Sequence, residues 1–103
     1  MQIQVNTDHH TSGGEKVVEY VRAVVGDALT NYSDRLTRVE VHLGDENASG
    51  TGKDDMRCMI EARLERRQPI AVTHHAQTID QAIEGAAGKL QRSLEHQLGK
   101  IRS

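Results

Sequence analysis

Basic side chains near the end of the chain have the spacing of a single helix face. Lys89, Arg92, His96 and Lys100 follow one another at intervals of three and four residues. Residues at these intervals are neighbours on a helix surface, so the four side chains would form one ridge. Such a ridge could contact nucleic-acid phosphates, because lysine and arginine displace the counterions condensed on them. Since Glu84 and Glu95 are interspersed, a solvated helix face without a ligand is the alternative interpretation.

The six histidines make a metal site the second chemistry to consider. Five of them follow or end predicted strands at one end of the predicted sheet, namely His9, His10, His42, His74 and His75. Three imidazoles can hold zinc and leave a fourth position open to water. Against this, the first and fourth strands would be opposite edges of the sheet, about 14 Å apart, and adjacent histidines on a strand point to opposite faces. We therefore favour surface or helix-flanking histidines, with a metal site and pH sensing as alternatives, and expect no cofactor.

The sequence contains no arrangement of residues that is typical of an enzyme. Cys58 falls on the inward face of a predicted strand, where a buried hydrophobic role is expected rather than a nucleophilic one. The glycines before Lys53 lack the P-loop spacing, and no Ser or Thr follows the lysine. No pair of carboxylates is placed to act together with a base. We therefore expect neither catalysis nor a small-molecule substrate.

The composition limits both the fold and the location. The chain has 103 residues, the size of one domain, which we expect to span residues 1–103. It contains no Phe and no Trp, so its core must consist of Val, Ile, Leu, Ala and Met. The single cysteine excludes an intrachain disulfide framework. Because no apolar run reaches the length of a membrane span and no signal segment opens the chain, we expect a soluble, cytoplasmic protein without a membrane partner.

The formal net charge of −2 conceals an uneven distribution along the chain. Residues 44–55 hold four acidic residues against a single lysine, whereas residues 89–103 hold four basic residues against a single glutamate. Residues 44–55 are also polar with three glycines, which predicts a long, mobile hairpin loop. The basic segment lies in a predicted helix, where it can present its charge as an ordered surface.

Polar–apolar alternation predicts four strands, at residues 2–6, 37–43, 56–65 and 70–75. Two helices with one-sided apolar stripes come after the first strand and after the fourth. The first helix follows Ser12, which forms the spacing of a capping box with Glu15, and should end near residues 32–34. The second helix begins after Thr78, which forms a second capping box with Gln81.

The apolar residues of these elements define a two-layer fold. The inward strand positions are Val39, Val41 and Leu43 in the second strand and Met56, Cys58, Ile60, Ala62 and Leu64 in the third. The helix stripes are Val17, Val21, Val24, Val25 and Ala28, with Leu29 at the edge, and Ile79, Ala82, Ile83, Ala86, Leu90, Leu94, Leu98 and Ile101. The prediction is an α+β fold of order β-α-β-β-β-α, with a four-stranded mixed sheet and both helices on one face. The first two strands should be parallel through a right-handed crossover, and an antiparallel meander should follow.

Two segments of the last helix match a known family. Together with the order of the elements, Asp80-Gln81-Ala82-Ile83 and Lys89-Leu90-Gln91-Arg92-Ser93-Leu94 resemble the last-helix pattern, A-I followed by K-L-x-R-x-L, of the hibernation-promoting factor / ribosome-associated inhibitor family, once called sigma-54 modulation proteins. The resemblance spans nearly the whole chain and is strongest over residues 78–98. It implies a fold similar to a double-stranded-RNA-binding domain. With its end at Ser103 the chain resembles the short members, which lack a further C-terminal dimerisation domain.

The resemblance also implies a function, a partner and a binding site. The family members bind the small (30S) ribosomal subunit at its decoding region, contact 16S rRNA and silence translation in starved or stationary cells. The residues expected to contact rRNA here are Lys89, Arg92, His96, Lys100 and Arg102 from the last helix, Arg22 from the first helix, and Arg35 and Arg38 after it. The first helix lacks the lysines that the family usually carries toward its end. A protein-interaction or stress module that has lost ribosome binding is therefore the alternative function, and a metal-binding histidine protein is the third.

Overall fold

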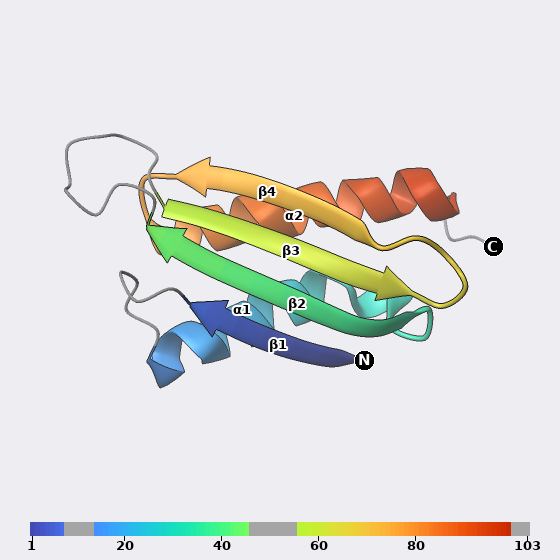
Figure 1. Ribbon diagram of the computed structural model, residues 1–103, viewed down its shortest axis with the longest axis horizontal. Coiled ribbons are helices and arrows are strands. Elements are labelled where there is room, and N and C mark those ends of the chain that lie inside the picture. Colours follow the sequence, from blue (N-terminus) through green and yellow to red (C-terminus); the bar gives the residue numbers. More distant parts are fainter. Residues whose placement is uncertain (8–13, 46–55, 100–103) are drawn as a thin grey trace.

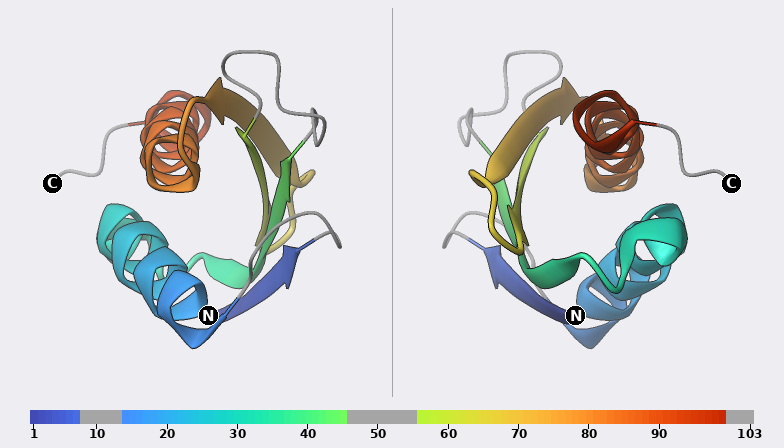
Figure 2. Two further views of the ribbon diagram at one scale, coloured as in Figure 1. Left: turned by 90° about the vertical axis from the view of Figure 1, so that its left-hand side faces the viewer. Right: turned by 90° about the vertical axis from the view of Figure 1, so that its right-hand side faces the viewer.

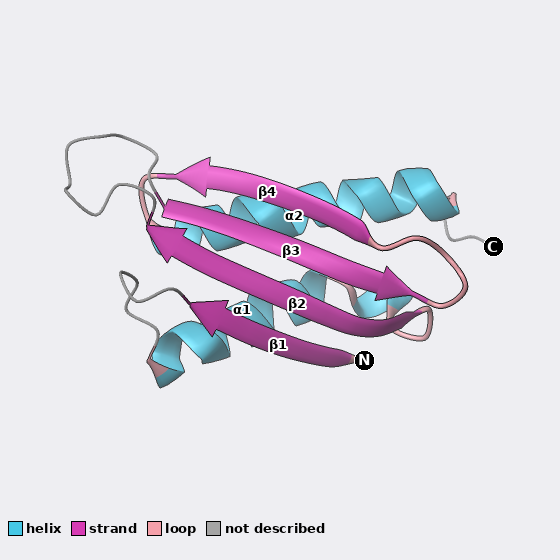
Figure 3. Ribbon diagram, viewed as in Figure 1, coloured by secondary structure: helices cyan, strands magenta, loops and turns pink. Residues whose placement is uncertain are grey.

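The structure, a computed structural model, describes residues 1–7, 14–45 and 56–99, and the statements below concern these residues. Its elements are strand β1 (Gln2–Thr7), helix α1 (Glu15–Ala28), a short 3₁₀ helix (Thr30–Tyr32), strands β2 (Leu36–Asp45), β3 (Met56–Leu64) and β4 (Ile70–Ala76), and helix α2 (Ile79–Leu98) (Figures 1 and 3). The predicted order β-α-β-β-β-α is confirmed. No helix among these residues is long and apolar enough to cross a bilayer.

The four strands form one mixed sheet in the order β1-β2-β3-β4. Strands β1 and β2 are parallel, whereas β2–β3 and β3–β4 are antiparallel, as predicted. An apolar row crosses the sheet where Val41 faces Val5 on one side and Ile60 on the other, and Ile60 in turn faces Val72. Both helices cover the same face of this sheet and lie next to each other, which leaves the other face uncovered (Figure 2).

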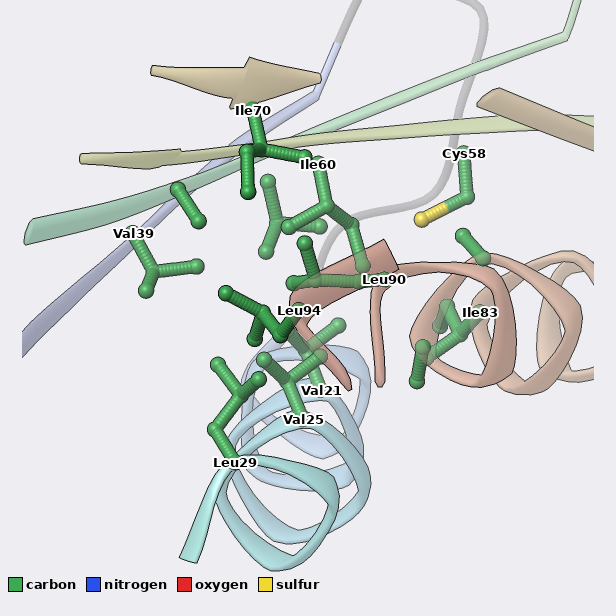
Figure 4. Close-up of a cluster of buried hydrophobic side chains, with 14 of the residues drawn as sticks. Val21, Val25, Leu29, Val39, Cys58, Ile60, Ile70, Ile83, Leu90 and Leu94 are labelled. Carbon is green, nitrogen blue, oxygen red and sulfur yellow. The ribbon is translucent and has the colours of Figure 1, made fainter. Parts of the chain in front are cut away.

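The core lies between the helices and the covered sheet face (Figure 4). The predicted inward positions of β2 and β3 are buried, although Met56 is only partly so. Helix α1 contributes Val21 and Val25, while Val17, Val24 and Ala28 are partly buried. Leu29, predicted at the edge of the stripe, is completely buried because the chain bends toward the sheet after α1. The stripe of α2 is also buried from Ala82 to Leu94, and it additionally includes Ala87.

The prediction for the start of α2 is confirmed, but the one for the start of α1 is wrong. The Gln81 amide donates to the Thr78 hydroxyl at 3.1 Å, as a capping box requires. Helix α1 instead begins at Glu15 with the extended residue Gly14 as its N-cap, and no side chain caps it. Glu15 is therefore the first helical residue and not the third, so it cannot play the predicted part. The negative charge of Glu15 still interacts favourably with the positive, N-terminal end of the helix dipole.

Two boundaries also differ from the prediction. Helix α1 ends at Ala28, before the predicted residues 32–34, because the Thr30 hydroxyl donates to the carbonyls of Gly26 and Asp27 at 3.1 and 3.0 Å and the chain then continues as a 3₁₀ turn. Strand β2 extends to Asp45, so the first two residues of the predicted hairpin loop belong to the sheet. Residues 46–55 lie outside the described residues, and the mobility predicted for them stays a prediction.

Candidate nucleic-acid interface

The predicted ridge on α2 is an exposed surface in the structure. Lys89, Arg92 and His96 are all exposed, while Leu90 and Leu94 between them are buried. The Lys89 ammonium donates to the Thr73 carbonyl of β4 at 2.8 Å, which leaves two of its three N–H groups for a ligand. A guanidinium nitrogen of Arg92 lies 3.5 Å from the position that a Cβ atom on Gly88 would occupy. The lysine and arginine of the family pattern are therefore solvent-facing, whereas its leucines belong to the core.

Two of the residues expected to contact rRNA come after the described part of the last helix. Lys100 and Arg102 lie outside the described residues, and so does the last apolar residue of the stripe, Ile101. Helix α2 ends at Leu98, and Gly99 follows it in a left-handed conformation with φ of 72°.

Helix α1 lies beside α2 and runs in the same direction (Figure 1). The Tyr20 hydroxyl of α1 donates to the Glu84 carboxylate of α2. This hydrogen bond, with burial and the nearby acids, raises the pKa of Tyr20 to about 12, so the phenol is neutral at physiological pH. Exposed acidic residues occupy the N-terminal halves of both helices, namely Glu15, Glu19, Asp80 and Glu84. Arg22 is exposed in the middle of α1.

The remaining predicted arginines, Arg35 and Arg38, lie in different places. Arg38 is on the uncovered sheet face, where its guanidinium pairs with Glu40 at 2.7 Å and also hydrogen-bonds Gln4. The structure therefore does not bring Arg38 together with the ridge on the helices. Arg35 is exposed in the connection before β2, at the end of the molecule where both helices end.

Sequence reasoning missed two arginines, Arg66 and Arg67, in the turn between β3 and β4. From the sequence, Arg66-Arg67-Gln68-Pro69 between the third and fourth predicted strands indicates only a turn, because Pro69 fixes its own φ and supplies no backbone donor. In the structure the Arg67 guanidinium donates to the carbonyl of Gln97 in the last turn of α2 at 3.3 Å. The turn therefore lies against the basic end of the helix. A signal was present, since two adjacent arginines at a hairpin tip are displayed to solvent, but the sequence does not say which helix end the tip meets.

The histidines are distributed over different surfaces. His74 is on the covered face of β4, where its ring contacts the helix at Gly85, and His75 points to the uncovered face opposite Arg57. His42 is also on the uncovered face, with Nε2 3.6 Å from a Glu40 carboxylate oxygen. Among the described residues, no three His, Cys, Asp or Glu side chains are close enough together to hold a metal ion. His9 and His10 lie outside the described residues, so the metal alternative needs a direct test.

Adding zinc at micromolar concentration should leave the Tm of the protein unchanged. A ligand that binds only the folded state raises the Tm, and the described histidines converge on no common point. The measurement is thermal unfolding followed by circular dichroism with and without zinc. A rise that disappears in the His42→Ala variant would instead establish the metal-binding interpretation.

The buried position of Cys58 agrees with a packing role. The side chain has no exposed surface, and burial raises the pKa of its thiol to about 12 despite the opposing effect of Arg57. The reactive thiolate is therefore almost unpopulated at neutral pH. Cys58 fills the space between β3 and α2 near Ile83, where a small apolar side chain is needed (Figure 4).

Comparisons with known proteins support this fold and these motifs. Residues 3–102 match the family described as "Sigma 54 modulation protein / S30EA ribosomal protein". The N-terminal domain of Protein Y from Thermus thermophilus is similar in structure, with a TM-score of 0.74, 19% sequence identity, and coverage of 93% of this chain and 98% of that one. A ribosomal subunit interface protein from Coxiella burnetii has a TM-score of 0.79 at 12% identity, with coverage of 97% of this chain and 100% of that one.

A sequence comparison with curated proteins found no match. Because both structural neighbours are less than one-fifth identical to this chain, they establish its fold and not its binding partner. The family match extends over nearly the whole chain, and it includes both segments of α2 on which the sequence resemblance rests. This chain belongs to the sigma 54 modulation protein / S30EA ribosomal protein family.

Proposed function

We propose that this protein is a cytoplasmic, ribosome-associated translation inhibitor that binds the small ribosomal subunit at its decoding region. In this proposal, residues 1–103 act as one non-enzymatic domain that contacts 16S rRNA through the surface of its two helices during starvation or stationary phase. The observation that carries the proposal is the family match over residues 3–102. A structural neighbour that is itself described as a ribosomal subunit interface protein supports it.

The helix surface offers chemistry that suits an RNA backbone. Lys89 and Arg92 are exposed cations on one side of α2, with His96 one turn beyond. Phosphate contacts supply most of the sequence-independent affinity of nucleic-acid-binding proteins, and they need no pocket. The acidic N-terminal halves of the helices repel phosphate, so we expect the RNA to meet the C-terminal halves. The negative net charge of the chain is thus compatible with a locally basic contact.

Association with small subunits should weaken steeply as salt increases. If Lys89, Arg92, Lys100 and Arg102 each neutralise one phosphate, the slope of log affinity against log salt should be about −3 or steeper, at roughly −0.7 to −0.9 per contact. This corresponds to a loss of about two decades between about 50 and about 250 mM salt. Co-sedimentation with purified small subunits in sucrose gradients measures it. If the protein stays in the supernatant even at the lowest salt, the proposed function is wrong.

The acidic halves of the helices favour the alternative from the sequence, a protein-interaction or stress module that has lost ribosome binding. Glu15 and Glu19 of α1 lie at the same end of the helix layer as Asp80 and Glu84 of α2. Such a surface suits a basic protein better than RNA. The sedimentation experiment separates the two functions, because only the ribosome-associated form pellets with subunits.

A further inference from the structure

Three arginines gather at the end of the molecule where both helices end, outside the ridge predicted from the sequence. They are Arg35, Arg66 and Arg67, and we call them the end cluster. The amide of Glu65 donates to the Arg35 carbonyl at 3.1 Å, which holds the start of β2 against the end of β3. Arg66 and Arg67 follow at once in the β3–β4 turn. Figure 2 (right) views this end of the molecule directly.

The turn is fixed in place against α2. The Arg67 guanidinium donates to the Gln97 carbonyl at 3.3 Å and so satisfies one of the last carbonyls of the helix. A cation is also favoured at the negative end of the helix dipole. Arg66, Arg67, Gln68 and Gln97 together line a shallow hollow beside the helix. His96 precedes Gln97 and Arg92 lies one turn before His96, so the turn meets α2 at the end of the helix that carries these two side chains.

The backbone of the β3–β4 turn is strained at Arg66. Arg66 has φ of 64° and is the only residue other than glycine with positive φ among the described residues. Residues other than Gly, Asn and Asp are uncommon in this left-handed conformation. Glycine would adopt it without strain. Strained residues of this kind concentrate at functional sites, and here the side chain retained is a long cation at the tip of a hairpin.

The charges of the end cluster are available to a ligand. Within the described parts of the chain, no carboxylate pairs with Arg35, Arg66 or Arg67, although Asp34 and Glu65 are neighbours in sequence. On the uncovered sheet face, by contrast, Arg38 pairs with Glu40 at 2.7 Å and Arg63 with Glu61 at 3.8 Å. In a chain of net charge −2, an end that keeps three arginines without ion-pair partners is suited to an anionic partner.

We propose that the end cluster is a second phosphate-contacting surface, so that an RNA strand lying along α2 continues around its C-terminal end onto the β3–β4 turn. Arginine suits this role because its planar guanidinium donates to two phosphate oxygens at once. Arg67 keeps further N–H groups for phosphate while one holds Gln97. This inference rests on the proposed function, and it adds to that function a contact on a different element.

The test compares two double variants with the same change in charge. Arg66→Gln/Arg67→Gln removes two cations from the end cluster, and Arg57→Gln/Arg63→Gln removes two from the uncovered sheet face. Binding of each to purified small subunits is measured over a salt series. The end-cluster variant should bind about ten-fold more weakly than wild type. Its slope of log affinity against log salt should be shallower by about 1.4 to 1.8, since each lost phosphate contact accounts for roughly 0.7 to 0.9. The sheet-face variant should match wild type.

A single substitution separates binding from folding. Arg66→Gly relieves the left-handed strain, so its Tm should equal or exceed that of wild type while its affinity for the subunit falls. If the two double variants have equal affinities and equal slopes of log affinity against log salt, the end cluster does not contact RNA. The proposed function would then remain intact. A weaker affinity with an unchanged slope would assign this end to a protein surface of the subunit and overturn the RNA contact. If wild type itself does not bind small subunits, both proposals are wrong.

Discussion

The Lys89→Glu/Arg92→Glu variant should bind small ribosomal subunits at least about 100-fold more weakly than wild type at low salt. Each substitution removes a charge-assisted hydrogen bond to phosphate, worth about 1.5–3 kcal/mol, and two such losses exceed the ~2.7 kcal/mol that correspond to 100-fold. Each also places a carboxylate where a phosphate would lie, which adds repulsion. Co-sedimentation and a competition assay with labelled wild type measure the effect.

The variant should remain folded, because both side chains lie beside the apolar stripe and not in it. Lys89 has one structural contact, the hydrogen bond from its ammonium to the Thr73 carbonyl. Losing an exposed hydrogen bond of this kind lowers the free energy of unfolding by about 1 kcal/mol. A small decrease in Tm is therefore expected together with the large loss of binding, and the two measurements must be made on the same samples.

Arg57→Glu/Arg63→Glu is the matched control for this experiment. It makes the same change in net charge on the uncovered sheet face, so it tests whether overall charge alone reduces binding. We expect its affinity to remain close to that of wild type. If the Lys89/Arg92 variant binds subunits as tightly as wild type does, the helix surface is not the interface. If both variants lose binding equally, net charge and not position controls the association.

Features with a strict period, and the cap of α2, could be predicted from the sequence. The alternation in β2 and β3 placed Val41 and Ile60 correctly in the core, and the same pattern placed Cys58 there. The start of α2 was predicted because the Thr78 hydroxyl and the Gln81 amide are three residues apart, so the interaction depends on local backbone alone. For the same reason the exposed positions of Lys89 and Arg92 follow directly from the apolar stripe beside them.

The cap of α1, and features that depend on the meeting of distant segments, could not be predicted. The capping box assigned to Ser12 and Glu15 failed because a four-residue pattern does not show where the backbone turns into the helix, and here Gly14 takes the cap position. The contribution of Arg66 and Arg67 to the basic end depends on the packing of the β3–β4 turn against Gln97. No local pattern relates residues that are 30 positions apart in the chain.

The contact between Gly85 and His74 also joins segments that are distant in the sequence. Because of it, replacement by alanine should change the stability in opposite directions at two helical glycines. Both Gly26 of α1 and Gly85 of α2 lie within helices, where alanine is normally better by about 0.5–1 kcal/mol. A methyl group on Gly26 would meet nothing within 4 Å, whereas one on Gly85 would lie 2.1 Å from the His74 ring. Gly26→Ala should therefore stabilise the protein, and Gly85→Ala should destabilise it.

The destabilisation by Gly85→Ala should be about 2 kcal/mol, or roughly 10 °C in Tm, because the clash reaches the Cγ atom of His74 and the ring must leave its place between β4 and α2. Thermal unfolding of the single variants and of Gly85→Ala/His74→Ala measures it. Removing the ring should restore most of the lost stability, since the two residues then no longer compete for the same space. Equal Tm shifts for Gly26→Ala and Gly85→Ala would contradict the close approach of the helix to β4.

That approach also positions Lys89, one turn beyond Gly85, over the Thr73 carbonyl. Gly85→Ala should therefore weaken subunit binding as well, and the His74→Ala substitution should restore both properties together.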